Sequence, residues 1–308
     1  MRIWAARHAL TLALGLGAAA CRAAGDVEIR SDPVSLRFSG ERAFALEAEL
    51  VRQFPRRHSG QPNNRRAVEW LRAHFAGLGL ACSVDDWEVV NYSRPVGLRN
   101  LACSLPGRSG REIVLVAHHD HSPATIQGAD NDGSGVAILM HLAELFAADV
   151  AAGGPPAHTL VFLSADAEEY GMLGSRRYVR THPDRDRLIA AISLDNLGKK
   201  WAVGLEMSPL GQFRGYGALW LQRLAQAAAR AASGIWVPRM HSPLEQAVDQ
   251  AVPVSLMDQG PFVAAGVPAL GFANVYDPAA RDEAWRTYHS PDDVIEYQSP
   301  EVLGQSGR

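Results

Sequence analysis

Three short apolar runs, separated by helix-like segments, constrain the fold of this 308-residue chain more than any other feature. The runs cover Glu112–His118, Thr159–Ala165 and Ile189–Leu194. They are almost continuously apolar, which is typical of strands that are buried on both faces of a sheet. Strands that alternate with helices in this way predict a doubly wound α/β fold with right-handed crossovers.

Further elements are predicted on both sides of these runs. Asn63 and Asn64 are expected to cap a helix whose apolar residues, from Val68 to Leu78, recur at helical spacing. The remaining predicted helices cover residues 43–54, 136–148 and 216–232, together with one that follows the Glu168-Glu169 loop and ends at about His182. The remaining strands cover residues 81–90, 98–105 and 266–271.

The first 25 residues have the pattern of an export signal. Arg2 and Arg7 precede the apolar stretch Ala9–Ala20, which is too short to span a bilayer but suits a secretory signal. The residues 18–21, Ala-Ala-Ala-Cys, look like a lipoprotein cleavage site, so Cys21 is a candidate for a lipid anchor. We therefore expect a signal peptide at 1–25 and a single domain at 26–308, exported as a periplasmic, membrane-anchored or secreted protein.

Charge and cysteine content narrow the class of protein. The net charge is −3, and lysine and arginine are scattered along the chain, so the sequence predicts no nucleic-acid partner. Two cysteines, Cys82 and Cys103, remain after the predicted signal. They suit either one disulfide or two buried thiols, and they are too few for a thiolate metal site.

Residues that can ligate a metal follow the ends of the three runs. His118 ends the first, Glu168 and Glu169 follow the second, and Asp195 follows the third. Because the carboxyl ends of parallel strands meet at one edge of a sheet, these side chains should converge. Asp120 is placed to accept the other ring N–H of His118, as carboxylates behind metal-ligating histidines do. A second histidine, His289, follows later in the chain. An imidazole and a carboxylate, twice over, suit two zinc ions.

The motifs at these positions resemble those of the family-28 metallopeptidases. This family of di-zinc aminopeptidases belongs to clan MH, which also includes plasma glutamate carboxypeptidase and glutaminyl cyclase. The order and spacing of the motifs match over roughly residues 60 to 300. The motifs are His118-x-Asp120, the Gly-rich loop at 128–135, the Glu168-Glu169-x-Gly-x-Leu-Gly-Ser segment, Leu194-Asp195 and Tyr288-His289-Ser.

The resemblance implies a fold, a ligand set and an activity. It implies a three-layer αβα sandwich with a mixed, mostly parallel central sheet. His118 and Asp195 would hold one zinc, Glu169 and His289 the other. Glu168 would be the general acid/base of an aminopeptidase acting on a peptide or a small amino-acyl substrate. A hydrogen bond from Tyr288 to the oxyanion would fit the same chemistry.

Asn131 departs from the family pattern. It stands where the family has the aspartate that bridges the two metals, and an amide offers one neutral oxygen to two cations. Three outcomes follow: Asp130 or Asp132 takes over, one zinc is weakened or lost, or the site is silent and the fold serves as a binding module. We favour a metal site that is retained but altered, because every other ligand and the base are present.

Two alternatives to an aminopeptidase stay open at this stage. The first is a glutaminyl-cyclase-like transferase with one zinc, which the compact segment from Glu169 to Gly174 disfavours. The second is the silent binding module, which only Asn131 supports. The family's final helix should begin near Ser299, and with the sequence ending at Arg308 we expect part of it to be lacking. Residues 201–209 and 256–262 should line the substrate pocket, but they predict neither side-chain preference nor oligomeric state.

Overall fold

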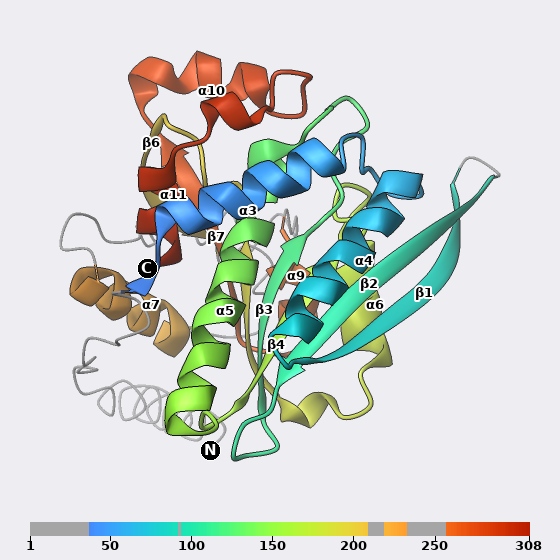
Figure 1. The fold of residues 1–308 in the computed structure, drawn as a ribbon, viewed down its shortest axis with the longest axis vertical. Helices are drawn as coiled ribbons and strands as arrows, with labels where there is room; N and C mark the ends of the chain where they lie inside the picture. Colours follow the sequence, from blue (N-terminus) through green and yellow to red (C-terminus); the bar gives the residue numbers. More distant parts are fainter. Residues whose placement is uncertain (1–36, 92–93, 209–218, 233–256) are drawn as a thin grey trace, which may run out of the picture.

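The computed structural model describes residues 37–308, apart from residues 92–93, 209–218 and 233–256. The predicted signal at 1–25, with Cys21, lies outside the described residues, as does the start of the helix predicted at 216–232. One mixed sheet organises the described part, with the strand order β1-β2-β4-β3-β5-β7-β6. Figure 1 shows helices packed on both faces of this sheet, so the predicted three-layer α/β fold is confirmed.

The middle of the sheet is parallel and its edges are antiparallel. Strands β4, β3, β5 and β7 run parallel, whereas β2 and β6 pair antiparallel with the outer members of this group. The strands are β1 (Ala81–Asn91), β2 (Arg94–Leu105), β3 (Glu112–His118), β4 (Thr159–Ala165), β5 (Leu188–Leu194), β6 (Ala202–Ser208) and β7 (Ala269–Tyr276).

Alternate residues of the central strands pack into two separate apolar layers, because successive side chains of a strand point to opposite faces of the sheet. In β3, Leu115 packs into the layer that contains α3, α4 and α5, whereas Val114 and Val116 pack into the layer that contains α6 and α9. Both faces are therefore covered, which explains why the sequence shows unbroken apolar runs. These helices are α3 (Gly40–Gln53), α4 (Pro62–Gly77), α5 (Gly135–Gly153), α6 (Leu173–Thr181) and α9 (Gln259–Ala264).

Three further helices complete the described part. α7 (Leu219–Ala232) packs Leu221 against Leu270 of β7. α10 (Arg281–Thr287) leads into the loop of His289, and α11 (Pro300–Gly307) lies beside α3 (Figure 1). Within the described residues, one helical stretch, Ala129–Gly153, is long and apolar enough to cross a membrane. It contains α5, which is packed against the sheet, so we assign it to the core.

The capping prediction for Asn63 and Asn64 is wrong. α4 begins at Pro62 behind Gln61, and no side chain caps it. Proline suits this position because its missing N–H would have no partner in the first turn. The two asparagines make tertiary contacts instead: Asn63 Nδ2 donates to the carbonyl of Pro55, and Asn64 Nδ2 donates to Asp166 Oδ1.

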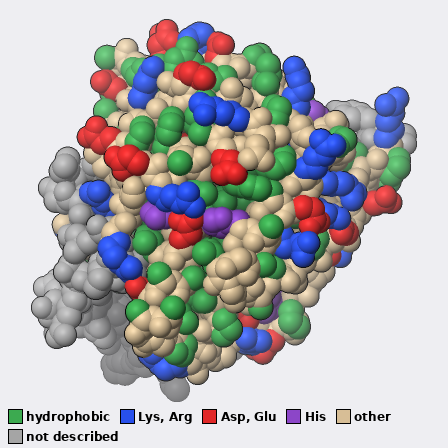
Figure 2. Space-filling view, viewed as in Figure 1, with side chains coloured by type: hydrophobic (Ala, Val, Ile, Leu, Met, Phe, Trp, Pro, Cys, Tyr) green, Lys and Arg blue, Asp and Glu red, His purple; other side chains and the backbone are tan. Residues whose placement is uncertain are grey.

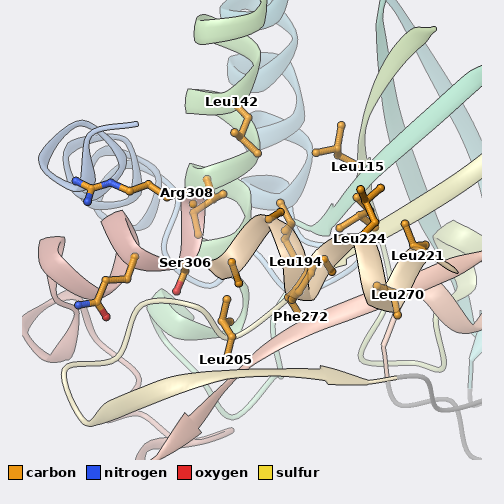
Figure 3. Close-up of a pocket in the computed structure, with 17 residues that line it drawn as sticks. Leu115, Leu142, Leu194, Leu205, Leu221, Leu224, Leu270, Phe272, Ser306 and Arg308 are labelled. Carbon is orange, nitrogen blue, oxygen red and sulfur yellow. The ribbon is translucent and has the colours of Figure 1, made fainter. Parts of the chain in front are cut away.

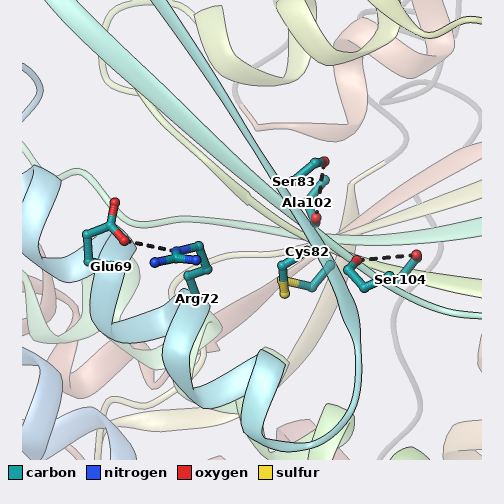
Figure 4. Close-up of a disulfide and its surroundings, with 8 residues drawn as sticks. Glu69, Arg72, Cys82, Ser83, Ala102 and Ser104 are labelled. Atoms are coloured by element: carbon teal, nitrogen blue, oxygen red, sulfur yellow. Dashed lines mark hydrogen bonds and ion pairs between the residues drawn. A yellow bond between two sulfur atoms is a disulfide. The ribbon is translucent and has the colours of Figure 1, made fainter.

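Cys82 and Cys103 form a disulfide. Cys82 and Cys103 face each other in the β1–β2 pair and are joined there (Figure 4). Replacing both with alanine should lower the free energy of unfolding by about 2–4 kcal/mol, because the bond restricts the unfolded chain. Urea unfolding of the double variant, beside wild type with and without a reductant, checks this. Equal stability of oxidised and reduced wild type would contradict it.

Candidate metal centre

The predicted site residues lie at the carboxyl edge of the parallel strands. His118 is the last residue of β3, Glu168 and Glu169 follow β4, and Asp195 follows β5. These three strands are neighbours in the sheet, with β3 in the middle. Two loops complete the group: the irregular turn η1 (Ala129–Ser134), which contains Asn131 and precedes α5, and the His289 loop after α10.

The His118 side of the centre contains three close donor atoms. His118 Nε2 lies 3.0 Å from Asn131 Oδ1 and 3.7 Å from Asp195 Oδ1. The carboxyl of Glu168 is next to them, with Oε2 3.9 Å from the same nitrogen. All three donor residues are buried.

The Glu169 side is a second pair. Glu169 Oε1 lies 3.1 Å from His289 Nε2. The amide nitrogen of Asn131 contacts both, at 2.8 Å from Glu169 Oε1 and 2.9 Å from His289 Nε2. The structure thus places Asn131 between two imidazole–carboxylate pairs. The roles of these residues as ligands, and of Glu168 as base, stay predictions.

Asp120 contacts both His118 and the backbone of Glu168. Its Oδ1 lies 3.3 Å from His118 Nδ1 and accepts the backbone N–H of Glu168 at 3.2 Å. A carboxylate behind an imidazole orients the ring and selects its tautomer. Asp120 is therefore placed to position both a predicted ligand and the predicted base.

The two acids that flank Asn131 have other partners. Asp130 Oδ2 lies 3.2 Å from Lys199 Nζ and accepts from the Tyr276 hydroxyl at 2.9 Å, so its side chain is committed away from the centre. Asp132 Oδ2 accepts the backbone N–H of His118 at 3.2 Å, and its Oδ1 accepts that of Gly135 at 2.9 Å. Among the described residues, Asp132 forms a metal-ligand cluster with His118 and Asp195, their ligand atoms lying within 4.8 Å of one another. Of the two substitutes considered for Asn131, only Asp132 is near the centre.

Asp293 is a positioning residue that the sequence analysis missed. Its two carboxylate oxygens accept the backbone N–H groups of Asp130 at 2.9 Å and of Asn131 at 3.1 Å. It therefore fastens the His289 loop to the Asn131 loop. In the sequence, the one feature that could have pointed to Asp293 is its position four residues after His289, in the same polar segment.

Asp166 was also missed, and it supports the loop of the paired glutamates. Oδ1 accepts from the Ser59 hydroxyl at 2.8 Å and from Asn64, while Oδ2 accepts the backbone N–H of Arg99 at 2.9 Å. The following residue, Ala167, has a φ of 59°, a strained value for a residue with a side chain. These contacts hold the start of the loop against β2 and the segment before α4.

Burial and neighbouring charges shift the pKa values of Glu168 and His118. Burial raises the pKa of Glu168 well above its usual range, and Asp195 raises it further against the opposing effect of His118. Burial opposes the charged form of His118, but the nearby carboxyl groups of Asp120 and Asp195 raise its pKa overall. A buried carboxyl with a raised pKa, next to metal-ligand types, is what general acid/base chemistry requires.

A cavity of about 700 Å³ opens beside Asp195. Its wall includes Glu206 and Met257, which fall in the two segments predicted to line the substrate pocket, together with Arg281 and Tyr288. The ring of Tyr288 stacks on that of His289 with centroids 3.9 Å apart. Burial, with the charges of Asp195 and Glu169, raises the pKa of Tyr288, so its hydroxyl stays protonated and can donate.

Two other groups of side chains lie away from the centre. A second cavity, about 310 Å³, is lined mostly by apolar side chains, among them Leu115, Leu221 and Leu270 (Figure 3). Figure 2 shows histidine, acidic and basic side chains close together on the face of the molecule that is seen in Figure 1. Glu144 of α5 contacts His141 at 2.8 Å and His74 at 3.5 Å. Neither group contains a residue of the predicted centre.

Imidazole and carboxylate groups that converge at the carboxyl edge of an α/β sheet are typical of metal-dependent hydrolases. The family model described as peptidase family M28 matches residues 100–308. The chain belongs to this family, and the predicted resemblance is confirmed.

Curated relatives include leucine aminopeptidases. Leucine aminopeptidase 1 of Aspergillus fumigatus is 37% identical over 158 residues, which cover 48% of this chain and 41% of the relative. Leucine aminopeptidase 1 of Grosmannia clavigera is 29% identical over 199 residues, covering 58% and 48%. The chain thus spans less than half the length of these relatives.

Solved structures share the fold at low identity. A zinc aminopeptidase from Bacillus subtilis aligns with a TM-score of 0.71 and 17% identity, over 88% of this chain and 93% of that one. A glutaminyl cyclase from Porphyromonas gingivalis aligns with a TM-score of 0.73 and 22% identity, over 88% and 95%. The fold is therefore common to both classes of enzyme and does not choose between them.

Proposed function

We propose that this protein is an exported, zinc-dependent exopeptidase, specifically an aminopeptidase. The observation that carries the proposal is the Glu168 carboxyl, whose side chain is 11% exposed and lies 3.9 Å from His118 Nε2, beside two imidazole–carboxylate pairs that meet at Asn131. The family membership and the leucine aminopeptidase relatives support the same activity.

The donor set fits zinc. Neutral imidazole nitrogens and carboxylate oxygens are its usual ligands, and His118 presents Nε2 to the centre while Nδ1 faces Asp120. His118 and Asp195 would hold one ion, and Glu169 and His289 a second. Zinc, when bound, polarises a carbonyl group and acidifies a water molecule.

The chain's own residues would move the proton and orient the substrate. Glu168 accepts the proton of the attacking water and returns it to the nitrogen of the leaving amine. Tyr288 donates its hydroxyl hydrogen to the developing oxyanion. The cavity beside Asp195 receives the amino-acyl side chain of the peptide or small amino-acyl substrate.

Two observations support export. Residues 1–25 have the pattern of a secretory signal, with Cys21 as the candidate lipid attachment site. The disulfide between Cys82 and Cys103 suits an oxidising compartment. We propose a periplasmic, membrane-anchored or secreted protein on these grounds.

A glutaminyl-cyclase-like transferase is the second candidate. It is favoured by the structural similarity to glutaminyl cyclases and by Asn131, whose single amide oxygen suits one zinc better than two. The short segment between Glu169 and Gly174 favours the peptidase.

Assays with both substrate classes test the proposal. The purified mature protein, with its zinc content measured by mass spectrometry, is given a leucine chromogenic amide and, separately, an N-terminal glutaminyl peptide. We expect amide hydrolysis that a chelator abolishes and added zinc restores. Cyclisation without hydrolysis would establish the transferase, and inactivity with both substrates in folded protein would favour the binding module.

A further inference from the structure

We infer that Asn131 makes the two halves of the centre unequal, so that zinc binds between His118 and Asp195 in preference to the Glu169–His289 pair. This inference rests on the proposed zinc-dependent function and specifies how many ions the centre holds tightly. It depends on the direction in which the Asn131 amide points, on the spacing of the donor atoms and on the charges in each half.

The neighbours of Asn131 fix the direction of its amide. The Glu169 carboxylate can only accept hydrogen bonds, and it accepts from Asn131 Nδ2 at 2.8 Å. The same nitrogen lies 2.9 Å from His289 Nε2. Turning the amide over would place its oxygen against the Glu169 oxygen. The backbone is also held, because Asp293 accepts the Asn131 N–H at 3.1 Å.

The His118 half consequently has three donors for a cation. The oxygen of Asn131 lies 3.0 Å from His118 Nε2, and Asp195 Oδ1 lies 3.7 Å from the same nitrogen. Ligands held about 2.1 Å from a tetrahedral zinc are about 3.4 Å apart, and these two distances bracket that value. Asp120 Oδ1 lies 3.3 Å from Nδ1, so it is placed to accept Nδ1–H and leave Nε2 to a metal.

Among the residues that the structure describes, the Glu169 half has two donors. Its third neighbour is the NH₂ group of Asn131, which has no lone pair for a metal and presents partly positive hydrogens to it. The charges point the same way. Asp195 and the adjacent Asp132 place two carboxylates near the His118 half, whereas Glu169 is the carboxylate paired with His289. A cation in the Glu169 half would need Asn131 to turn over and release its contacts.

Zinc titration of isosteric variants tests the inference. Calorimetry and zinc content after dialysis against buffered zinc are measured for wild type, Asp195→Asn and Glu169→Gln, with circular dichroism to confirm folding. We expect one tightly bound zinc ion in wild type. Asp195→Asn should weaken the affinity for this ion by roughly tenfold or more, because loss of a ligand should cost at least as much as loss of a group that supports a ligand. Glu169→Gln should leave the affinity for the same ion within about threefold of the wild-type value. Asn131→Asp should bind a second zinc tightly.

Three results would overturn the inference. They are two equally tight zinc ions in wild type, loss of the tight zinc in Glu169→Gln but not in Asp195→Asn, and no zinc binding by folded protein. The zinc stoichiometry is measured without substrate, so its result is independent of whether the protein is an aminopeptidase. Inactive protein with one zinc in the His118 half would contradict the aminopeptidase assignment alone.

Discussion

Glu168→Gln is expected to lower kcat for a leucine amide by roughly 10²- to 10⁴-fold while leaving the zinc content unchanged. Glutamine has the shape of glutamate but cannot take a proton from water and return it to an amine. The loop should keep its place, because Asp120 accepts the backbone N–H of Glu168 and not its side chain. Steady-state kinetics at saturating substrate, with zinc quantified in the same preparation, check this.

Glu88→Gln is the matched control for this experiment. Glu88 is an exposed residue of β1, outside the centre and the cavity beside Asp195, so its replacement should leave kcat unchanged. If Glu168→Gln retained kcat within about threefold, Glu168 would not be the base, since general acid/base groups contribute far more. If its zinc were lost, Glu168 would be assigned as a ligand.

Lys199→Met should lower the free energy of unfolding by about 3–5 kcal/mol, because it leaves a buried carboxylate without its cation. Lys199 is 1% exposed, and its ammonium lies 3.2 Å from Asp130 Oδ2, in the loop that contains Asn131. Urea unfolding of the metal-free protein measures the loss.

The neighbouring lysine provides the control. Lys200 is exposed and lies over the rings of Trp201 and Tyr297, so Lys200→Met should cost only about 0.5–1 kcal/mol. Combining Lys199→Met with Asp130→Asn should recover part of the lost stability, because the two residues interact directly. Similar losses for the two single lysine variants would show that Tyr276 and the Gly198 N–H suffice to stabilise Asp130.

Much of the centre was predictable because strand ends are predictable. An apolar run that stops at a polar residue locates the carboxyl edge of a sheet, and His118, Glu168 and Asp195 each follow such a run. The order of the strands in the sheet then brings these residues together. Neither step required knowledge of a loop conformation.

The supporting carboxylates were not predictable in the same way. Asp293 and Asp166 act on backbone N–H groups far away in the sequence, and local patterns contain no information about such partners. Asn63 and Asn64 show the converse, since polar residues before a helix favour capping until tertiary contacts compete for them. Pairing of the two cysteines likewise depended on the β1–β2 register.

The hydrogen bond between the Asp293 carboxylate and the Asn131 backbone N–H bears on the order of folding. The two residues are 162 positions apart, so this contact closes one of the long loops of the chain. Contacts of such separation are costly to form early, because the entropy of the intervening chain must be lost first. We therefore expect the loop between the two imidazoles to acquire its backbone partners late in folding. The centre cannot take its final shape before residue 293 has been synthesised.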